Sequence, residues 1–418
     1  MLAPVHGGLF KPVNRIEPRD RVNYPAWRKL PAIAVHESDR TSLYRIADGT
    51  LSPLNGPMSQ AEYRTSLEHG AIERGGVRWA WTIPTVLPVT DDEAAQCTVG
   101  REVGLHFSGD VFGKLRVKDV YDWDKAEFVK RICGPSQVDQ PGRRSWSSDP
   151  RAKCVSGEIT LASFIDVRPF AKRMLPPLQT RALIERKGYE QTVALPTCSP
   201  LLRADEYTLA RGAETLLRET GKRIGAILNP SIASSPGGAV PAEVRMQTYE
   251  ALVQARSFGA GDIDEELWKQ RGQSLAEQLE LVGLDVPTYS AGPREAVMQA
   301  IYRQNCGYTH FIVGRNHVDA FGDHESALRD DADPRSIFEQ LGGALAIKAI
   351  AVGPAAYIEE IGRVGLVDEH PGKTQVTLSG AMLRETLRNG EMPDARVMRA
   401  TTAKVLAVYY QVQNKAEA

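Results

Sequence analysis

Residues 193–207, with the sequence VALPTCSPLLRADEY, join an apolar stretch, a tight turn and a helical pattern. The stretch Thr192–Leu195 predicts a short buried strand. Ser199 is a favoured N-cap residue and Pro200 suits the first helical position, so we expect a helix to begin there. A strand that runs directly into a helix N-terminus aims unpaired backbone N–H groups at one point, which suits the phosphates of a nucleotide. An ordinary turn between a strand and a helix, without a ligand, would give the same pattern.

This segment resembles the signature of the ATP sulfurylase (sulfate adenylyltransferase) family, ALQTRNPxHRAHEY. The matching positions include Thr197, Pro200, Arg203, Ala204, Glu206 and Tyr207. Through this resemblance Thr197 is a candidate catalytic residue and Arg203 is a candidate nucleotide ligand. The resemblance implies that the segment lies at the active site of a nucleotidyltransferase.

Most of the side chains that carry the family's chemistry are replaced in this chain. The family's Gln and Arg, which hold sulfate, correspond to Pro196 and Cys198, so both are assigned to the acceptor pocket. Its Asn corresponds to Ser199, and its two His residues, which hold the ATP phosphates, correspond to Leu202 and Asp205. Cys198, Ser199 and Asp205 are therefore further candidate catalytic residues. Cys198 is either a nucleophile or a small residue that makes space for a larger acceptor.

A second motif, AGPREA at Ala291–Ala296, opens a helical pattern and is identical to a motif of the same family. Arg294 carries N–H donors in a planar fork that fits phosphate oxygens. The resemblance therefore makes Arg294 a nucleotide ligand. An ion pair between Arg294 and a buried Glu that holds the helix is the alternative interpretation.

A third motif, GRNHVDAFG at Gly314–Gly322, follows the apolar strand pattern Thr309–Gly314 and resembles the family's GRDHAGxG loop. The resemblance implies a catalytic role for Arg315, which would offset the charge of the triphosphate. It also implies a run of four nucleotide-binding residues, Gly314, Arg315, Asn316 and His317.

The acceptor side of the same loop departs from the family pattern. Val318 replaces an Ala whose backbone N–H helps to hold sulfate, so Val318 is assigned to the acceptor pocket, and Asp319 adds a negative charge beside it. Val352 ends the stretch AIAV, where the family has an apolar wall beside adenine, and is a candidate nucleotide contact. The segment Val240–Met246, VPAEVRM, also matches the family, where it starts a packing helix, and we interpret it as structural.

Strand and helix patterns divide this α/β chain into three predicted domains, 1–165, 166–330 and 331–418. The first is rich in Gly, Pro and short apolar runs, which predicts a mostly β domain. Its pieces resemble the family's PUA-like N-terminal domain. The second alternates strands and helices, which predicts a parallel, Rossmann-like sheet with ligands at the carboxyl ends of its strands. Through the resemblance this is a nucleotidyltransferase domain of the HxGH type, followed by a small C-terminal α/β subdomain.

Four element predictions are specific enough to be tested. The periodicity predicts helices over Ala242–Gln254 and Pro293–Asn305, and one charged helix over about Ile263–Val282. The polar, turn-rich segment Gln140–Lys153 is predicted to be an exposed loop.

The composition limits the classes of function that this chain is expected to have. The chain has 418 residues, a net charge of −1 and 42% hydrophobic residues, which is typical of a globular protein and gives no support for a nucleic-acid or membrane-surface partner. It has no apolar run of about eighteen residues and no P-loop. Its five scattered cysteines favour reduced thiols in a cytoplasm, and its His and Cys residues lack zinc-ligand spacing. The family resemblance implies a homodimer.

Together with the family resemblance, these observations predict a nucleotidyltransferase that binds ATP or another nucleotide with Mg²⁺ and acts on an acceptor other than sulfate. Because four ligand side chains are replaced, sulfate adenylylation is expected to be at least about 10⁴-fold slower than in an ordinary sulfurylase. One alternative is a catalytically inactive homologue that binds a ligand or a partner. The other is a sulfate adenylyltransferase with an altered site.

Overall fold

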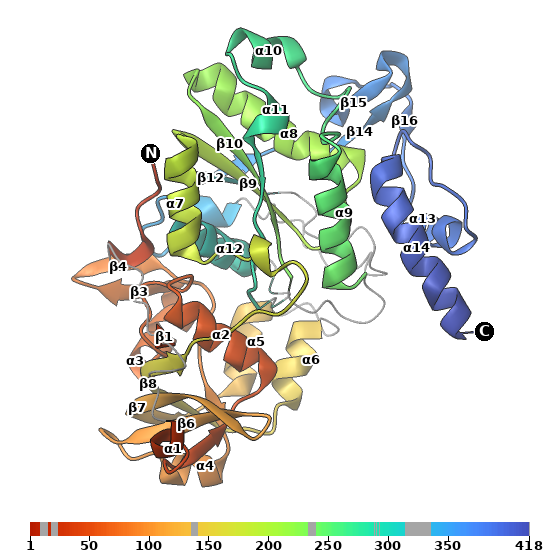
Figure 1. Ribbon diagram of the computed structural model, residues 1–418. Coiled ribbons are helices and arrows are strands. Elements are labelled where there is room, and N and C mark those ends of the chain that lie inside the picture. Colours follow the sequence, from red (N-terminus) through yellow and green to blue (C-terminus); the bar gives the residue numbers. More distant parts are fainter. Residues whose placement is uncertain are drawn as a thin grey trace.

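The computed structural model of the protein describes residues 1–8, 16–17, 24–134, 141–232, 240–287, 289, 291, 293–313 and 336–417. Figure 1 shows an N-terminal part in red and orange below a central part in which helices cover a sheet. The C-terminal part, in blue, packs beside the central part.

The N-terminal part is built on a six-stranded sheet in the order β1-β8-β7-β6-β2, with β5 also paired to β8. The strands are β1 (Ile16–Glu17), β2 (Ala32–Ala34), β3 (Ala71–Arg74), β4 (Val77–Ala80), β5 (Pro88–Val89), β6 (Glu102–Phe107), β7 (Asp110–Asp122) and β8 (Lys153–Ala162). The helices are α1 (Tyr24–Trp27), α2 (Glu37–Ala47), α3 (Gln60–His69), α4 (Asp91–Gln96), α5 (Lys125–Cys133) and α6 (Pro141–Ser148). The long strand β7 pairs antiparallel with both β6 and β8.

The prediction of a loop over residues 140–153 is wrong, because α6 occupies most of the segment, although Arg144, Ser145 and Ser147 are exposed as expected. Trp146 explains the difference. Its ring packs edge-on against Phe128, with ring centroids 5.0 Å apart, and stacks on Tyr289 at 5.8 Å. One aromatic anchor thus fixes a segment that is otherwise polar.

The central part is a five-stranded parallel sheet in the order β11-β10-β9-β12-β13, as the alternating pattern predicts. Its strands are β9 (Gln191–Thr197), β10 (Ile224–Pro230), β11 (Leu279–Leu281), β12 (His310–Val313) and β13 (Lys348–Ala351). Its helices are α7 (Pro177–Lys187), α8 (Arg203–Thr220), α9 (Ala242–Gln254), α10 (Glu265–Gln270), α11 (Leu275–Gln278) and α12 (Pro293–Asn305).

Successive strand residues face two different cores, as the pleat of a strand requires. Val193 and Leu195 join the core that contains Leu209 of α8 and Met246 of α9. Ala194 joins the opposite core, which includes residues of α7 and α12 and continues into the N-terminal part. The sheet is therefore covered on both faces, and only its edges and strand ends are open to a ligand.

The predictions for α9 and α12 are confirmed at both ends, whereas the single charged helix over 263–282 is wrong. Asp264 caps α10 by accepting from the Leu267 N–H, and Gly272, with a φ of 62°, interrupts the helix soon afterwards. Residues 279–281 instead form β11 and pair with Ala226–Leu228 of β10.

The C-terminal part has a small antiparallel sheet and two helices. The elements are β14 (Ala355–Ile358), β15 (Arg363–Leu366), β16 (Gln375–Val376), α13 (Gly380–Arg388) and α14 (Ala400–Glu417). Ser379 caps α13, and its side chain accepts from the Met382 N–H. Helix α14 packs on α9 of the central part (Figure 1).

Strand β13 lies beyond residue 330, yet it pairs with β12 along its whole length. The central sheet therefore extends into the predicted third domain, and the domain boundaries themselves stay a prediction. Among the described residues, no helix is long and apolar enough to cross a membrane.

Candidate nucleotide and acceptor site

The strand order identifies one edge of the central sheet as the candidate site. Numbered along the chain, the strands lie in the order 3-2-1-4-5, so the connections from the adjacent strands β9 and β12 leave in opposite directions. Ligands of doubly wound sheets bind outside the carboxyl ends of the strands at such a reversal. Residues Pro196–Ser199 end or follow β9 at this point, and Val352 follows the neighbouring strand β13.

Five predicted site residues follow β12 and lie outside the described residues: Gly314, Arg315, Asn316, His317 and Val318. Their predicted roles in nucleotide and acceptor binding stay predictions. Val352 is half-buried and packs against the same core as Leu201. Its predicted contact with adenine also stays a prediction.

The turn after β9 is held by hydrogen bonds to its backbone. The Thr197 carbonyl accepts from the Ser231 N–H at 2.8 Å. The Ser199 carbonyl accepts from the Thr197 hydroxyl at 3.2 Å and from the Tyr249 hydroxyl at 2.6 Å. The Cys198 carbonyl accepts from the Arg245 guanidinium. Every residue of the turn from Thr197 to Ser199 is thus fixed from the central part.

Helix α8 begins at Arg203, with Leu202 as its N-cap, so the predicted start at Ser199 and Pro200 is wrong. Two contacts explain the later start. The Asp205 carboxylate accepts from the Leu202 N–H at 2.8 Å, which is one half of a capping box. The Ser199 carbonyl is already held by Tyr249 and Thr197 and so stays outside the helix.

The later start also changes the predicted anion site at the helix N-terminus. The Leu202 N–H is used by Asp205, and the Arg203 N–H donates to the Val397 carbonyl at 2.9 Å. Backbone groups that the sequence suggested would be free for phosphate are therefore occupied. The candidate site depends on the turn and on the neighbouring strand ends rather than on this helix terminus.

Asp205 lies where the family signature has its second histidine. Burial raises the pKa of its carboxyl to about 6, and the hydrogen bond from the Leu202 N–H opposes the rise. The carboxyl therefore carries a proton in part of the molecules in weakly acidic solution. At such a pH this partial neutralisation lowers the repulsion that a nucleotide would meet from an aspartate at this position, whereas at neutral pH most of the charge remains.

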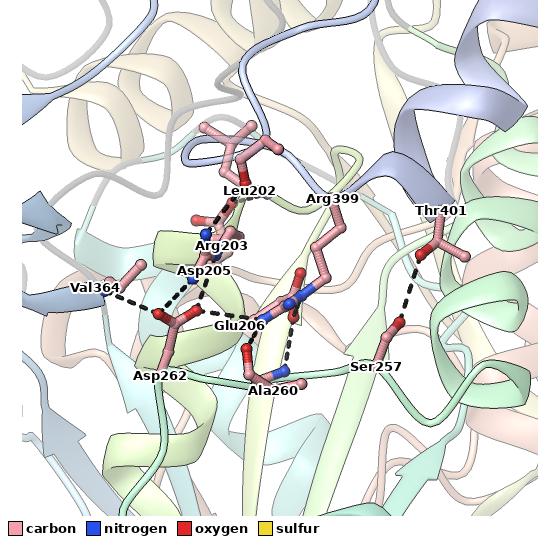
Figure 2. Close-up of polar contacts among 12 residues, drawn as sticks. Leu202, Arg203, Asp205, Glu206, Ser257, Ala260, Asp262, Val364, Arg399 and Thr401 are labelled. Carbon is pink, nitrogen blue, oxygen red and sulfur yellow. Dashed lines mark hydrogen bonds and ion pairs between the residues drawn. The ribbon is translucent and has the colours of Figure 1, made fainter. Parts of the chain in front are cut away.

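Arg203 belongs to a buried ion-pair network (Figure 2). Its guanidinium donates to both oxygens of Asp262, at 2.7 and 2.9 Å, and to the Ala395 carbonyl at 3.1 Å. The Asp262 side chain is completely buried and also accepts from the Val364 N–H. These contacts link α8 to the C-terminal part. The role of Arg203 in nucleotide binding stays a prediction.

A second Arg completes this network (Figure 2). Arg399 donates to Glu206 at 2.7 Å, to Asp262 at 3.2 Å and to the Ala260 carbonyl at 3.0 Å. Burial raises the pKa of Glu206 to about 7, although Arg399 and the Gly259 N–H stabilise its charged form. Two cations and two carboxylates thus join α8, the loop before α10 and the segment that leads into α14.

Arg294 contacts the N-terminal part. Its guanidinium donates to the Thr82 carbonyl at 3.0 Å, and the Thr82 hydroxyl donates back to the Arg294 carbonyl. Burial lowers the pKa of Arg294, and the charge of Arg131 lowers it further. Within the described ranges Arg294 has no carboxylate partner, and Glu295 instead accepts from the backbone N–H groups of Tyr289 and Ala291. The alternative of an ion pair that holds the helix therefore gains no support.

Two residues of this site escaped sequence interpretation, Arg245 and Tyr249. Both lie on α9 and contact carbonyls of the turn about fifty positions earlier in the chain. The segment VPAEVRM predicts the helix but gives no signal for the partners of its side chains. The part of the chain that the structure describes holds no group of three His, Cys, Asp or Glu residues arranged to bind a metal ion.

Comparison with known proteins identifies the family that this chain matches. The sequence model of the ATP-sulfurylase family matches residues 171–409, and that of a PUA-like domain matches residues 3–164. The sulfate adenylyltransferase of Pyropia yezoensis is 50% identical over 417 residues, which covers 99% of this chain and 98% of the relative. The sulfate adenylyltransferase of Desulforamulus reducens is 28% identical over 423 residues, which covers 99% and 100% of the two chains.

The fold has a solved counterpart. The hexameric APS kinase from Thiobacillus denitrificans superposes with a TM-score of 0.69 over 97% of this chain and 68% of that chain, at 19% identity. At this identity the likeness shows the fold alone.

These relatives correct the predicted function. A sulfate adenylyltransferase that is half identical along the whole chain contradicts the expectation of an acceptor other than sulfate. The prediction treated each replaced side chain as a lost contact, whereas a site can hold the same anion with charges from other elements. The chain belongs to the ATP-sulfurylase family of adenylyltransferases, and it combines a PUA-like N-terminal domain with a nucleotide-binding domain built on a parallel sheet.

Proposed function

We propose that this chain is a sulfate adenylyltransferase, which transfers the adenylyl group of ATP to sulfate and releases pyrophosphate. One observation carries the proposal: the 50% identity to the Pyropia enzyme of that name, which extends over almost the full length of both chains. The altered signature is therefore interpreted as a variant of the sulfate site.

The chemistry requires positioning and charge compensation. A sulfate oxygen attacks the α-phosphorus of ATP while the bond from that phosphorus to pyrophosphate breaks, so two anions must be brought together. In the proposal, the turn Pro196–Ser199 lines the acceptor side and Arg294 lies on the nucleotide side. The loop after β12 supplies further nucleotide contacts through Gly314, Arg315, Asn316 and His317. Val352, which follows β13, supplies another.

Mg²⁺ enters this proposal as the partner of the ATP phosphates, which need a cation to offset their charge. Asp205 is a carboxylate that could accompany it, because it lies only six positions after Ser199. One of its oxygens already accepts from the Leu202 N–H, and its pKa of about 6 leaves it largely ionised at neutral pH. A contact through water suits this geometry better than a rigid carboxylate cage.

The proposal also includes a homodimer and a cytoplasmic location. All five cysteines lie in the described ranges and no disulfide joins them, which suits a reducing compartment. The mass in solution, measured by sedimentation, tests the homodimer. A single species near 45.9 kDa, the mass of one chain, would contradict it.

A pyrophosphate-release assay tests the activity. The protein is incubated with ATP, CTP, GTP or UTP, with and without sulfate, and with a pyrophosphatase that removes the product. We expect release only when ATP and sulfate are both present, together with a new adenylyl sulfate signal. Release that proceeds with another oxyanion and not with sulfate would contradict the proposal.

A further inference from the structure

We propose that Arg245 supplies the positive charge that holds the acceptor anion at the end of β9, where Cys198 stands in place of the signature arginine. The inference rests on the proposed function, because it names the residue that binds the acceptor of that reaction. It assigns a binding role to a segment that the sequence alone indicates to be structural.

The position of Arg245 is the first argument. It lies in the first turns of α9, which begins directly after Pro241, and only 2% of its surface is exposed. Its guanidinium reaches across to β9 and donates to the Cys198 carbonyl. A permanent positive charge is therefore fixed at the backbone of the residue that replaces the signature arginine.

The second argument is that the turn does not need this charge to keep its shape. One helical turn beyond Arg245, the Tyr249 hydroxyl holds the next carbonyl of the same turn, that of Ser199, at 2.6 Å. A neutral donor therefore suffices to fix a backbone carbonyl here. Burying a guanidinium is much more costly than burying a hydroxyl, so Arg245 brings to the turn a charge that a bond to a backbone carbonyl does not require.

The third argument concerns the electrostatics of this cluster. Burial raises the pKa of the Tyr249 hydroxyl, the Arg245 charge opposes the rise, and Cys198 and Asp205 add to it. The cation and the Asp205 carboxyl therefore both act on the same small region. An anion brought to the turn would meet the repulsion of Asp205 unless Arg245 offsets it.

The main experiment compares Arg245→Met with Tyr249→Phe. Both variants release one carbonyl of the same turn, but only the first removes a charge. We expect Arg245→Met to raise the sulfate KM by about tenfold to a hundredfold, which is typical for losing a hydrogen bond to a charged group, and to change the ATP KM far less. Tyr249→Phe loosens the turn without favouring either substrate, so we expect it to change the two KM values in similar proportion. Arg245→Lys, which keeps the charge, should fall between the wild type and Arg245→Met.

Rescue provides the decisive arm. Cys198→Arg, introduced into the Arg245→Met variant, returns a cation to the signature position. We expect the sulfate KM of this double variant to be at least about tenfold lower than that of Arg245→Met. The proposal is overturned if this double variant binds sulfate no better than Arg245→Met. It is also overturned if Arg245→Met changes the sulfate and ATP KM values in the same ratio as Tyr249→Phe.

A binding measurement separates failure of this inference from failure of the proposed function. Sulfate stabilises a protein that binds it, so the rise in melting temperature with sulfate concentration measures affinity without turnover. If the wild type releases no pyrophosphate with ATP and sulfate, the proposed function fails, and the melting curves still test Arg245. If the wild type is active and its sulfate-dependent rise is equal in Arg245→Met, the inference fails alone.

Discussion

Asp205 illustrates, at the scale of one residue, how local surroundings set the chemistry of a replaced side chain. The signature has histidine at this position, and an ionised aspartate there would repel phosphate. Its carboxyl is partly buried and accepts from the Leu202 N–H, and burial raises its pKa to about 6. The folded protein thus holds a proton on Asp205 at pH values where the unfolded chain has lost it.

The Asp205→Asn variant tests this placement. Because the folded pKa of about 6 lies above the usual value of 3.8, ionisation of Asp205 reduces stability as pH rises from about 4 to about 6. Asparagine cannot ionise, so the stability of the variant relative to wild type should improve across this window, by at most about 3 kcal/mol. Urea unfolding at pH 4 and at pH 8 measures the change.

Asp264→Asn is the matched control, because Asp264 also lies at a helix N-terminus but has the opposite pKa shift. The hydrogen bond from the Leu267 N–H, and then that from Arg218, lower the pKa of Asp264. Its ionised form is stabilising, so Asp264→Asn should lose stability relative to wild type as pH rises. Parallel pH trends in the two variants would show that Asp205 is not a buried, proton-holding carboxyl.

The residues of the candidate site were predictable only where they lie close together in the sequence. The signature letters located Thr197, Cys198 and Ser199, and the strand pattern correctly placed them at the end of β9. Arg245 and Tyr249 could not be found this way, because their partners lie far away in sequence. The error about the acceptor came from interpreting each replaced side chain of the signature as a lost contact.

The buried network around Glu206 is the main link between elements. Arg203 and Glu206 from α8, Asp262 from the loop before α10, and Arg399 from the segment before α14 share hydrogen bonds in one cluster (Figure 2). Both carboxylate side chains are 0% exposed. Such a cluster is sensitive to the loss of one member, because the remaining charges stay buried.

Arg399→Met should therefore destabilise the protein by about 3–5 kcal/mol. Arg396→Met is the control from the same segment. Arg396 is 44% exposed and pairs with two partly exposed carboxylates, Asp394 and Glu359, so its loss should cost less than about 1 kcal/mol. Urea unfolding at neutral pH measures both variants.

The pH dependence sharpens this prediction. Because the pKa of Glu206 is already raised to about 7, Glu206 can take up a proton when its cation is removed. The effect of Arg399→Met should consequently be smaller at pH 5 than at pH 8. Equal losses for the Arg399 and Arg396 variants at pH 8 would contradict the network's role in holding the C-terminal part.

At the same scale, the secondary structure was predictable where one periodicity runs uninterrupted. Helices α9 and α12 have a regular apolar pattern, and their predicted bounds agree with the structure. Strand β11 was missed because it is three residues long and follows a helical pattern. Its strand character depends on pairing with β10, which is a tertiary contact, and α6 depends on the packing of Trp146 in the same way.

At the level of the whole molecule, contacts of the first residues connect the N-terminal part to α12 of the central part. The backbone N–H of His6 donates to the Asn305 side chain at 2.9 Å, and its ring bonds to the Ala80 carbonyl at 2.9 Å. Asn305 in turn donates to the carbonyls of Thr50 and Ser52. The His6 side chain is completely buried, and this burial lowers its pKa to about 4.

This junction predicts a specific acid sensitivity. Because the folded pKa of His6 lies below the usual 6.5, the neutral ring stabilises the fold fully above pH 6.5, and this contribution is lost as pH falls towards 4. The loss amounts to about 3 kcal/mol. In His6→Gln this part of the acid dependence should disappear, so the stability gap to wild type should narrow between pH 6.5 and pH 4.

His69→Gln, which alters an exposed histidine of the same domain, is the control and should follow the wild-type curve. Thermal unfolding across the pH range compares the three proteins. If the gap between His6→Gln and wild type stays constant with pH, His6 is not held neutral at the junction.

The central claim is that the altered signature still catalyses adenylylation of sulfate, and isotope exchange tests it most directly. Labelled pyrophosphate enters ATP only if adenylyl sulfate forms reversibly at the site. Run beside an ordinary sulfurylase at equal concentration, the protein should show exchange that depends on sulfate and lies within about a hundredfold of that control, or about 3 kcal/mol in barrier. Exchange that is absent, or equal with and without sulfate, would contradict the account.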